Sequence, residues 1–250
     1  MNVAQAIPTR LDPPAAVGAA APTVRAERLC ASIDGRPILR NITIELAKGS
    51  SVALLGANGA GKSTLLRVLS TLLRPSAGRL SLFGQEATGP QVRARIGMVA
   101  HQPMLYRDLT ALENLEFFGR LYGVRDAQAR AMELLEVVGV ADRARSVVGD
   151  LSRGMAQRVA IARALLGSNE LFLADEPFSG LDGASAGRVS EILAGLRYRG
   201  ATVVLVDHDT ARARERADRV IVLRGGRVVL DLAASSADDA TLREAVGEQP

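Results

Sequence analysis

The sequence is poor in cysteine, aromatic residues and lysine, and it lacks a long apolar run. The single cysteine, Cys30, excludes an internal disulfide framework and any CxxC metal or redox motif. Tryptophan is absent and aromatic residues make up 3% of the chain, which argues against a single-strand binder that works by stacking. No apolar run approaches the roughly 20 residues that span a bilayer, so we predict no transmembrane helix.

Lysine is the scarcest charged residue. Of the 31 basic residues only Lys48 and Lys62 are lysines, which leaves 29 arginines. The formal net charge of +4 raises the question of a nucleic-acid or membrane-surface partner. The basic residues are interspersed with 27 acidic ones and form no basic block. We attribute the charge to a general preference for arginine and predict no nucleic-acid partner.

The 250 residues, of which 48% are hydrophobic, suffice for one large domain with an insertion. Residues 1–22 are rich in alanine and proline and are predicted to be a disordered leader rather than a signal peptide. Residues 23–231 form the predicted domain, and residues from about 103 to 166 switch to helical periodicity. Residues 232–250 are predicted to be a short C-terminal tail.

Short β-rich runs alternate with helical patterns in the rest of the chain, which predicts an α/β core with a helical insertion. Thr110, Asp126 and Ser152 are predicted helix caps, and Gly225-Gly226 predicts a hairpin. The predicted strands are 42–46, 51–55, 80–83, 96–99, 171–174, 202–206, 219–223 and 227–230. The predicted helices are 63–73, the three capped ones that run through residues 122, 138 and 166, and a short one at 241–246.

Residues 56–63, GANGAGKS, match the pattern GxxxxGK[ST] between a strand and a helix. The backbone at Gly59 and Gly61 can wrap a phosphate because these residues have no Cβ. Lys62 supplies a positive charge and the Ser63 hydroxyl can ligate Mg²⁺. The alternative is that this glycine-rich turn is only a tight connection between the strand and the helix. The motif by itself does not distinguish kinases, GTPases and transport ATPases. The predicted nucleotide-binding residues here are Gly56, Ala57, Asn58, Gly59, Ala60, Gly61, Lys62, Ser63 and Thr64.

Two adjacent carboxylates end the apolar run 171–176. Such a strand places Asp175 at the carboxyl edge of the sheet, where nucleotides bind in open α/β folds and where the carboxylate can hold Mg²⁺. Glu176 is then positioned to orient or deprotonate an attacking water. The alternative is a pair of solvated acids at a strand end.

Residues 151–158, LSRGMAQR, lie shortly before these acids, with Ser152 standing 24 residues ahead of Glu176. Ser152 is both a helix cap and a hydroxyl donor, and Gly154 lets backbone amides approach an anion. An ordinary capped helix is the alternative. The string resembles the LSGGQ signature of ATP-binding-cassette (ABC) ATPases, with Arg153 in place of the usual first glycine.

The resemblance covers residues from about 24 to 231. Gln102 resembles the Q-loop glutamine, residues 179–182 (SGLD) the D-loop, and His208 the switch histidine. The spacings fit, with 40 residues from Lys62 to Gln102 and 32 from Glu176 to His208. The family implies a P-loop NTPase fold of ABC type, with a β-rich N-terminal subdomain and an inserted helical subdomain.

The resemblance also implies a split active site in a homodimer or a pair of ABC subunits. Two domains would enclose two ATP molecules head to tail, so that hydrolysis depends on closure of the dimer. Each ATP would contact Lys62, Ser63, Asp175 and His208 of one subunit and Ser152 and Gly154 of the other. Glu176 would be the general base, Gln102 would sense the γ-phosphate, and Asp182 would link the two sites. The implied metal ligands are Ser63, Gln102 and Asp175, and the implied cofactors are ATP and Mg²⁺.

One position departs from the family pattern. An aromatic residue usually stacks on adenine about where Ile33 stands. An aliphatic side chain offers apolar contact only, which leaves selectivity for adenine in doubt.

With one cassette and no membrane segment, the chain resembles the ATPase subunit of an exporter whose integral membrane subunit is separate. Residues 103–122 are where the family docks that partner, although Leu105, Leu109, Leu112, Leu115 and Phe118 could equally be core. The combination of residues 101–124, 151–166 (LSRGMAQRVAIARALL) and 175–182 (DEPFSGLD) is similar to the ATP-binding subunit of the haem exporter used in cytochrome c maturation. Related sequences occur in the ATPases of drug and polysaccharide exporters.

These resemblances imply a peripheral location on the cytoplasmic face of the inner membrane. The chain has no apparent haem ligand pair, and His101 could equally be a surface residue at a strand end. A soluble, non-transport ABC ATPase, such as an iron–sulfur assembly scaffold, is the alternative from another class.

Overall fold

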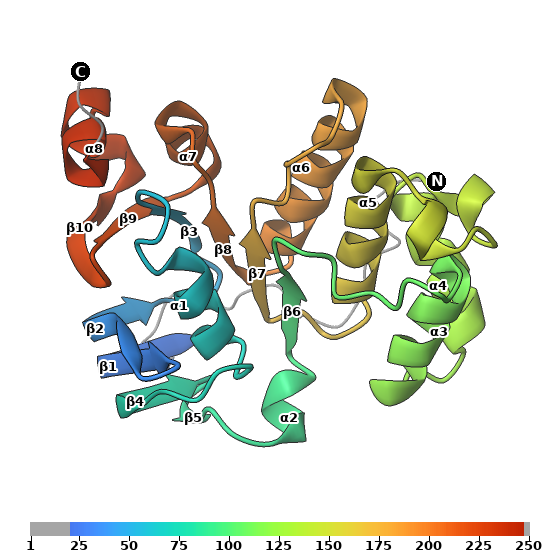
Figure 1. The fold of residues 1–250 in the computed structure, drawn as a ribbon, viewed down its shortest axis with the longest axis horizontal. Helices are drawn as coiled ribbons and strands as arrows, with labels where there is room; N and C mark the ends of the chain where they lie inside the picture. The colour runs from blue at the N-terminus through green and yellow to red at the C-terminus, as the bar shows by residue number, and fades with distance from the viewer. Residues whose placement is uncertain (1–20, 248–250) are drawn as a thin grey trace.

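The computed structural model describes residues 21–247. The leader predicted over 1–22 therefore lies, apart from its last two residues, outside the described residues, as do the last three residues of the predicted tail. Figure 1 shows two β-sheets with helices packed around them and the helices α3, α4 and α5 gathered at one end. No helix in the described part of the chain is long and apolar enough to cross a membrane.

The larger sheet has the strand order β10-β9-β3-β8-β7-β6. Its five strands from β9 to β6 are parallel, and β10 pairs with β9 in an antiparallel hairpin. The hairpin predicted at Gly225-Gly226 is confirmed, with φ of 56° and 76° at these residues. The strands are β3 (Ser51–Leu55), β6 (Ile96–Val99), β7 (Leu171–Asp175), β8 (Thr202–Val206), β9 (Arg219–Arg224) and β10 (Arg227–Ala233).

Side chains of the central strands alternate between two cores. On β7, Leu171 and Leu173 face a core shared with the smaller sheet and α1, whereas Phe172 and Ala174 face the helical insertion. Because both faces are covered, these strands are continuous apolar runs without polar alternation. The short runs that predicted buried strands at 171–174 and 202–206 have this origin.

The smaller sheet is antiparallel, with the order β2-β1-β4-β5. Its first strand was not evident in the sequence pattern. The pairing of β1 with β2 shifts register at several points, and Arg28 has a φ of 48°, so the two-residue alternation is interrupted. The strands are β1 (Val24–Ile33), β2 (Arg36–Leu46), β4 (Ala77–Leu82) and β5 (Gln85–Glu86).

The helix after β3 is shorter than predicted. Helix α1 ends at Leu69 instead of Leu73, because Thr71 adopts a left-handed φ of 62° and the Leu73 amide turns back to the carbonyl of Arg67. The α-helices are α1 (Lys62–Leu69), α2 (Pro90–Arg93), α3 (Ala111–Leu121), α4 (Ala127–Val137), α5 (Arg153–Ala164), α6 (Gly183–Tyr198), α7 (Thr210–Arg216) and α8 (Asp239–Val246). The 3₁₀ turns are η1 (Ala141–Arg143), η2 (Val148–Asp150) and η3 (Ala234–Ser236).

The predicted caps of the helical insertion are confirmed. Thr110 accepts the Glu113 amide at 3.1 Å, and the Glu113 carboxylate accepts the Thr110 amide at 2.8 Å, which completes a capping box on α3. Hydrogen bonds from the Thr110 amide and hydroxyl lower the pKa of Glu113. The stabilisation that the ionised Glu113 carboxylate gives to the cap is fully present above the ordinary glutamate pKa of about 4.3. It is lost as the pH falls through the lowered pKa of Glu113.

Loss of the Thr110 hydroxyl is expected to destabilise the protein. Thr110→Ala should lower the free energy of unfolding by about 1 kcal/mol, because the Glu113 amide loses its acceptor. Thermal unfolding should show a midpoint about 2–4 °C lower. Thr110→Ser keeps the hydroxyl and is the matched control, so equal midpoints for the two variants would contradict this role.

Candidate functional site

Four neighbouring parallel strands, β3, β8, β7 and β6, end at the same edge of the larger sheet (Figure 1). The loop that ends in Lys62 follows β3, and His208 follows β8. Asp175 and Glu176 stand at the end of β7, and Gln102 follows β6. The topology therefore brings these predicted site residues to one edge of an open α/β sheet, where ligands bind.

The phosphate loop is held in a shape that only glycine permits. Gly56 has a φ of 144°, and a Cβ there would stand 2.2 Å from the carbonyl oxygen of Leu223. Gly61 has a φ of 105° and would meet the Leu39 side chain at 2.9 Å. Gly61 also caps α1 without any side-chain hydrogen bond. The first amides of α1 are thus left for an anion.

Lys62 lies in the floor of this loop and is 7% exposed. Its Nζ donates to the carbonyl oxygens of Gly56, at 2.5 Å, and Ala57, at 3.0 Å. Burial lowers the pKa of Lys62, and the charges of Asp175 and Glu176 act in the opposite direction. The ammonium is therefore buried close to both predicted acids.

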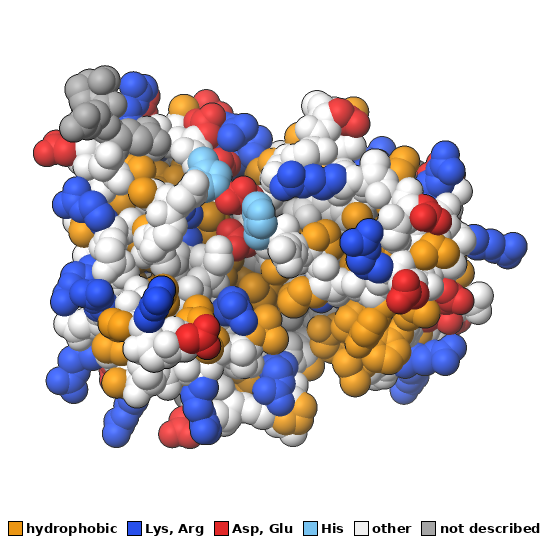
Figure 2. All heavy atoms as spheres, in the orientation of Figure 1, with side chains coloured by type: hydrophobic (Ala, Val, Ile, Leu, Met, Phe, Trp, Pro, Cys, Tyr) orange, Lys and Arg blue, Asp and Glu red, His pale blue; other side chains and the backbone are white. Residues whose placement is uncertain are grey.

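Glu176 is held between the two histidines of the chain. Its Oε1 lies 2.5 Å from Nε2 of His208, and its Oε2 lies 3.6 Å from Nδ1 of His101. Glu176 has a left-handed φ of 52°, which is uncommon for a residue with a side chain. Figure 2 shows the two histidines with acidic side chains between them in the middle of this face.

The donor set fits a divalent cation. Asp175 is 3% exposed at the end of β7, and Ser63 is exposed in the first turn of α1. A buried carboxylate and a hydroxyl are oxygen ligands of the kind that Mg²⁺ takes. Gln102 is exposed, and within residues 21–247 it makes no hydrogen bond. The structure thus places Gln102 at the same sheet edge, and within the described residues no hydrogen bond joins it to Asp175.

The signature residues form a second group with the D-loop. Ser152 caps α5 by accepting the Met155 amide at 3.3 Å. A Cβ on Gly154 would meet the Gly180 carbonyl at 2.9 Å, and Arg153 donates to the Ser179 hydroxyl at 3.1 Å. Arg153, which stands in place of the usual first glycine of the signature, thereby joins the signature to the D-loop.

Asp182 caps α6 by accepting the Ser185 amide at 2.8 Å, and hydrogen bonds from Ser185 lower the pKa of Asp182. In the described part of the chain, no hydrogen bond or ion pair joins Ser152 or Gly154 to the phosphate loop. One copy of the chain therefore presents the two predicted halves of the site as separate groups.

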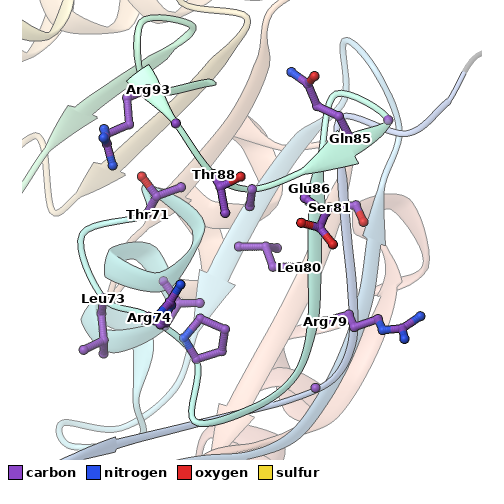
Figure 3. A pocket seen from close by; sticks show the side chains of 16 residues that line it. Thr71, Leu73, Arg74, Arg79, Leu80, Ser81, Gln85, Glu86, Thr88 and Arg93 are labelled. Carbon is purple, nitrogen blue, oxygen red and sulfur yellow. The ribbon is translucent and has the colours of Figure 1, made fainter. Parts of the chain in front are cut away.

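Cavities lie both at this sheet edge and elsewhere on the surface. Two small ones, of about 170 and 250 Å³, lie beside His208, and the first is also lined by the phosphate loop. A wider cavity, of about 920 Å³, lies instead between the end of α1 and the β4–β5 hairpin, with Thr71, Leu80 and Thr88 in its lining (Figure 3). No predicted site residue lines this wider cavity.

These features define a nucleotide-binding α/β domain of the P-loop type. The family ABC transporter matches residues 39–179. A fluoroquinolone-export ATP-binding protein of Mycobacterium tuberculosis is 41% identical over 77% of this chain and 64% of its own length. A phosphonate-import ATP-binding protein of Stutzerimonas stutzeri is 40% identical over 90% of this chain and 89% of its own. The chain belongs to the ABC transporter family.

A solved structure supports the same assignment. A dimeric ATP-binding cassette in a post-hydrolysis state, bound to ADP and phosphate, superimposes with a TM-score of 0.78 at 29% identity. The alignment covers 84% of this chain and 98% of that one. The predicted fold class is confirmed, and the predicted enzyme class and the cofactors ATP and Mg²⁺ are confirmed at the level of the family.

The comparisons leave the cargo open. The chain spans 64% of the first exporter's length, just under two thirds. These relatives include an exporter and an importer, and neither is named as a haem exporter. The narrower resemblance to a haem exporter stays a prediction. So does the effect of Ile33, which is half-buried at the end of β1.

One residue of the site was missed by the sequence interpretation. His101 is indeed a surface residue, 53% exposed at its side chain, but it also contacts the Glu176 carboxylate. Two signals could have found it. The chain has two histidines in 250 residues, and His101 directly precedes Gln102.

Proposed function

We propose that this chain is the ATP-hydrolysing subunit of a transporter whose membrane subunit is a separate chain. The observation that carries this proposal is the cluster of Lys62, Asp175, Glu176 and His208 at one sheet edge. ATP with Mg²⁺ supplies the phosphoryl group and the metal charge. Lys62 and the free amides of α1 bind the phosphates, and Asp175 with Ser63 holds the metal.

Glu176 is the general base in this proposal. Its carboxylate accepts a proton from the attacking water, and His208 holds Oε1 so that the carboxylate points to one place. Gln102 belongs to the loop that follows the edge strand β6 and would contact the metal or the γ-phosphate. These roles follow the family pattern.

Two copies of the chain, or a paired ABC subunit, complete each site. The separation of Ser152 and Gly154 from the phosphate loop supports this arrangement, because the free amides at the start of α5 then belong to the partner's nucleotide. The dimeric relative bound to ADP and phosphate is similar along most of this chain. Asp182 ends the D-loop, whose Ser179 and Gly180 contact the signature, which suits its role as a link between sites.

The structure changes which residues of the segment 103–122 are candidates for docking. Leu115 is fully buried, and Leu105, Leu112 and Phe118 pack against the core, so the face named from the sequence is largely core. The exposed apolar side chains are different ones and lie over α3, where Figure 2 shows an apolar patch. We call them the aromatic surface: Tyr106, Phe117, Leu121 and Tyr122, which are 51%, 45%, 69% and 38% exposed.

The aromatic surface gathers several of the chain's few aromatic residues, and hydrogen bonds of buried side chains hold the backbone next to it. The chain has eight aromatic residues, and three of them are in mutual contact, with ring centroids 5.3–6.0 Å apart. Tyr106 stacks on Phe118, and Phe117 lies edge-to-face with both rings. Buried Asn114 holds the preceding loop by bonds to the Tyr106 amide and carbonyl. Buried Arg163 donates to the carbonyls of Met98 and Met104. A rigid exposed aromatic group suits a protein–protein interface.

The proposal also concerns the molecule that is transported. We propose export of haem for cytochrome c biogenesis, on the combined similarity of residues 101–124, 151–166 and 175–182 to that exporter, with the chain peripheral on the cytoplasmic face of the membrane. Export of a drug or polysaccharide is the alternative within the family. A soluble ATPase that serves iron–sulfur assembly is the alternative outside transport.

Association with a membrane subunit tests the proposal. The full chain should sediment with membranes and co-purify with one integral membrane protein, whose complex hydrolyses ATP faster when its cargo is added. Leu121→Glu should weaken this association at least about tenfold, because it places an unpaired charge in the interface. Haem and a fluoroquinolone, tested separately, distinguish the cargo classes.

Tyr198→Glu is the matched control, since Tyr198 is 89% exposed on α6 and lies outside the aromatic surface. It should leave membrane association unchanged. A chain that stays out of the membrane fraction and purifies as a dimer with assembly proteins would establish the non-transport alternative instead.

A further inference from the structure

The second histidine on Glu176 is not explained by the machinery described so far. His208 holds Oε1 of Glu176, and His101 faces Oε2 from the opposite side at 3.6 Å. The two rings come from different strand ends, one after β8 and one after β6, with β7 and its carboxylate between them. Both histidines of the chain therefore contact the same side chain.

Packing does not account for the place of His101. Its side chain is 53% exposed, so burial of the ring contributes little to keeping it beside Glu176. The atom that faces the carboxylate is Nδ1, which can donate a hydrogen bond in a neutral imidazole. A polar contact with Oε2 is the interaction that the geometry offers to this ring.

A carboxylate held at one oxygen still turns about that contact. The Glu176 side chain is 23% exposed, so packing does not enclose the carboxylate on every side. Nδ1 of His101 lies 3.6 Å from Oε2, which is a polar contact slightly longer than a hydrogen bond, and a polar group at this place opposes such rotation. Each carboxylate oxygen retains a further lone pair, so a water can still be bound while both oxygens are held.

We propose that His101 is a positioning residue that fixes the Glu176 carboxylate through Oε2. The proposal rests on the proposed function of Glu176 as general base. His208 and His101 act from opposite sides, and together they hold the carboxylate plane in the orientation needed to accept the proton from water. His101 acts in this proposal through Glu176.

Three variants of the full chain test this role by steady-state ATP hydrolysis. His101→Ala removes the donor and should lower kcat about tenfold, with the KM for ATP changed less than twofold. His101→Asn places an amide N–H at the position of Nδ1 and should restore kcat to within about threefold of the wild type. His101→Gln moves the donor one bond outward and should resemble His101→Ala. Asp108→Ala, another exposed residue of the same loop, is the control and should change neither constant.

A double-mutant cycle identifies the carboxylate as the target. In the Glu176→Gln background, His101→Ala should change the residual rate less than twofold, because the base on which it acts is already absent. An unchanged kcat in His101→Ala, an equal loss in all three variants, or a lowered thermal midpoint that matches the lost activity would overturn the proposal. If Glu176→Gln itself hydrolyses ATP normally, the assignment of Glu176 as base fails first, so the two failures are distinguishable.

Discussion

Replacement of Glu176 by glutamine is expected to lower the kcat for ATP hydrolysis by about 10²- to 10⁴-fold while ATP still binds. Glutamine has nearly the same shape but cannot accept the proton of the attacking water. The amide can still contact His208, so the side chain should stay in place. The measurement is steady-state hydrolysis together with equilibrium binding of ATP.

The controls for this variant use other carboxylates. Glu191→Gln, on the exposed side of α6, removes a glutamate charge away from the site and should leave kcat unchanged. Hydrolysis at the wild-type rate in Glu176→Gln would refute its assignment as the base. Loss of ATP binding together with hydrolysis would instead indicate that Glu176 shapes the nucleotide site.

Lys62→Ala is expected to weaken ATP binding about a hundredfold, because it removes charge-assisted hydrogen bonds to the phosphates. The folded protein should not lose stability in the same measure. Burial lowers the pKa of Lys62, which means that the fold already disfavours its charged form. Equilibrium binding of ATP and thermal unfolding, measured on the same preparation, separate the two effects.

Lys48→Ala is the matched control, since Lys48 is the other lysine of the chain and is exposed. It should leave ATP affinity unchanged. Lys62→Arg tests geometry, because a planar guanidinium does not fit where a compact ammonium lies within 3.0 Å of two loop carbonyls. Undiminished affinity in Lys62→Ala would refute the phosphate-binding role of this loop.

Local signals in the sequence predicted several elements at their observed positions. The glycines of residues 56–61 need positive φ at Gly56, Gly59 and Gly61, so the pattern itself specifies the loop. The capping box of α3 depends on Thr110 and Glu113 alone. These features were predictable because the residues that form them are neighbours in the chain.

Non-local contacts escaped the same reasoning. Strand β1 is paired across register shifts, which interrupt the alternation that reveals a strand. Helix α6 carries several small residues and a weak apolar pattern, and its place is set by packing against β8. In α3, periodicity showed that one face is apolar but could not show that Leu115 is buried while Leu121 is exposed.

The chain by itself therefore determined the class of the protein. The phosphate loop, the acids after β7 and the signature are short motifs whose chemistry depends on residues close together in sequence. The family comparison agrees with them. The scarcity of lysine also gains a meaning, because one of the two lysines is the buried ammonium of the phosphate loop.

Only the tertiary structure decided how the separate motifs combine. Strand order places β7 between β6 and β8, and this brings His101 and His208, 107 residues apart in the sequence, to the two oxygens of Glu176. Hydrogen bonds between buried Asn114 and the backbone of Tyr106 bring the aromatic residues on either side of Thr110 into one exposed surface. Pairing of distant strands and burial of one helix face depend on the whole core, which no local pattern encodes.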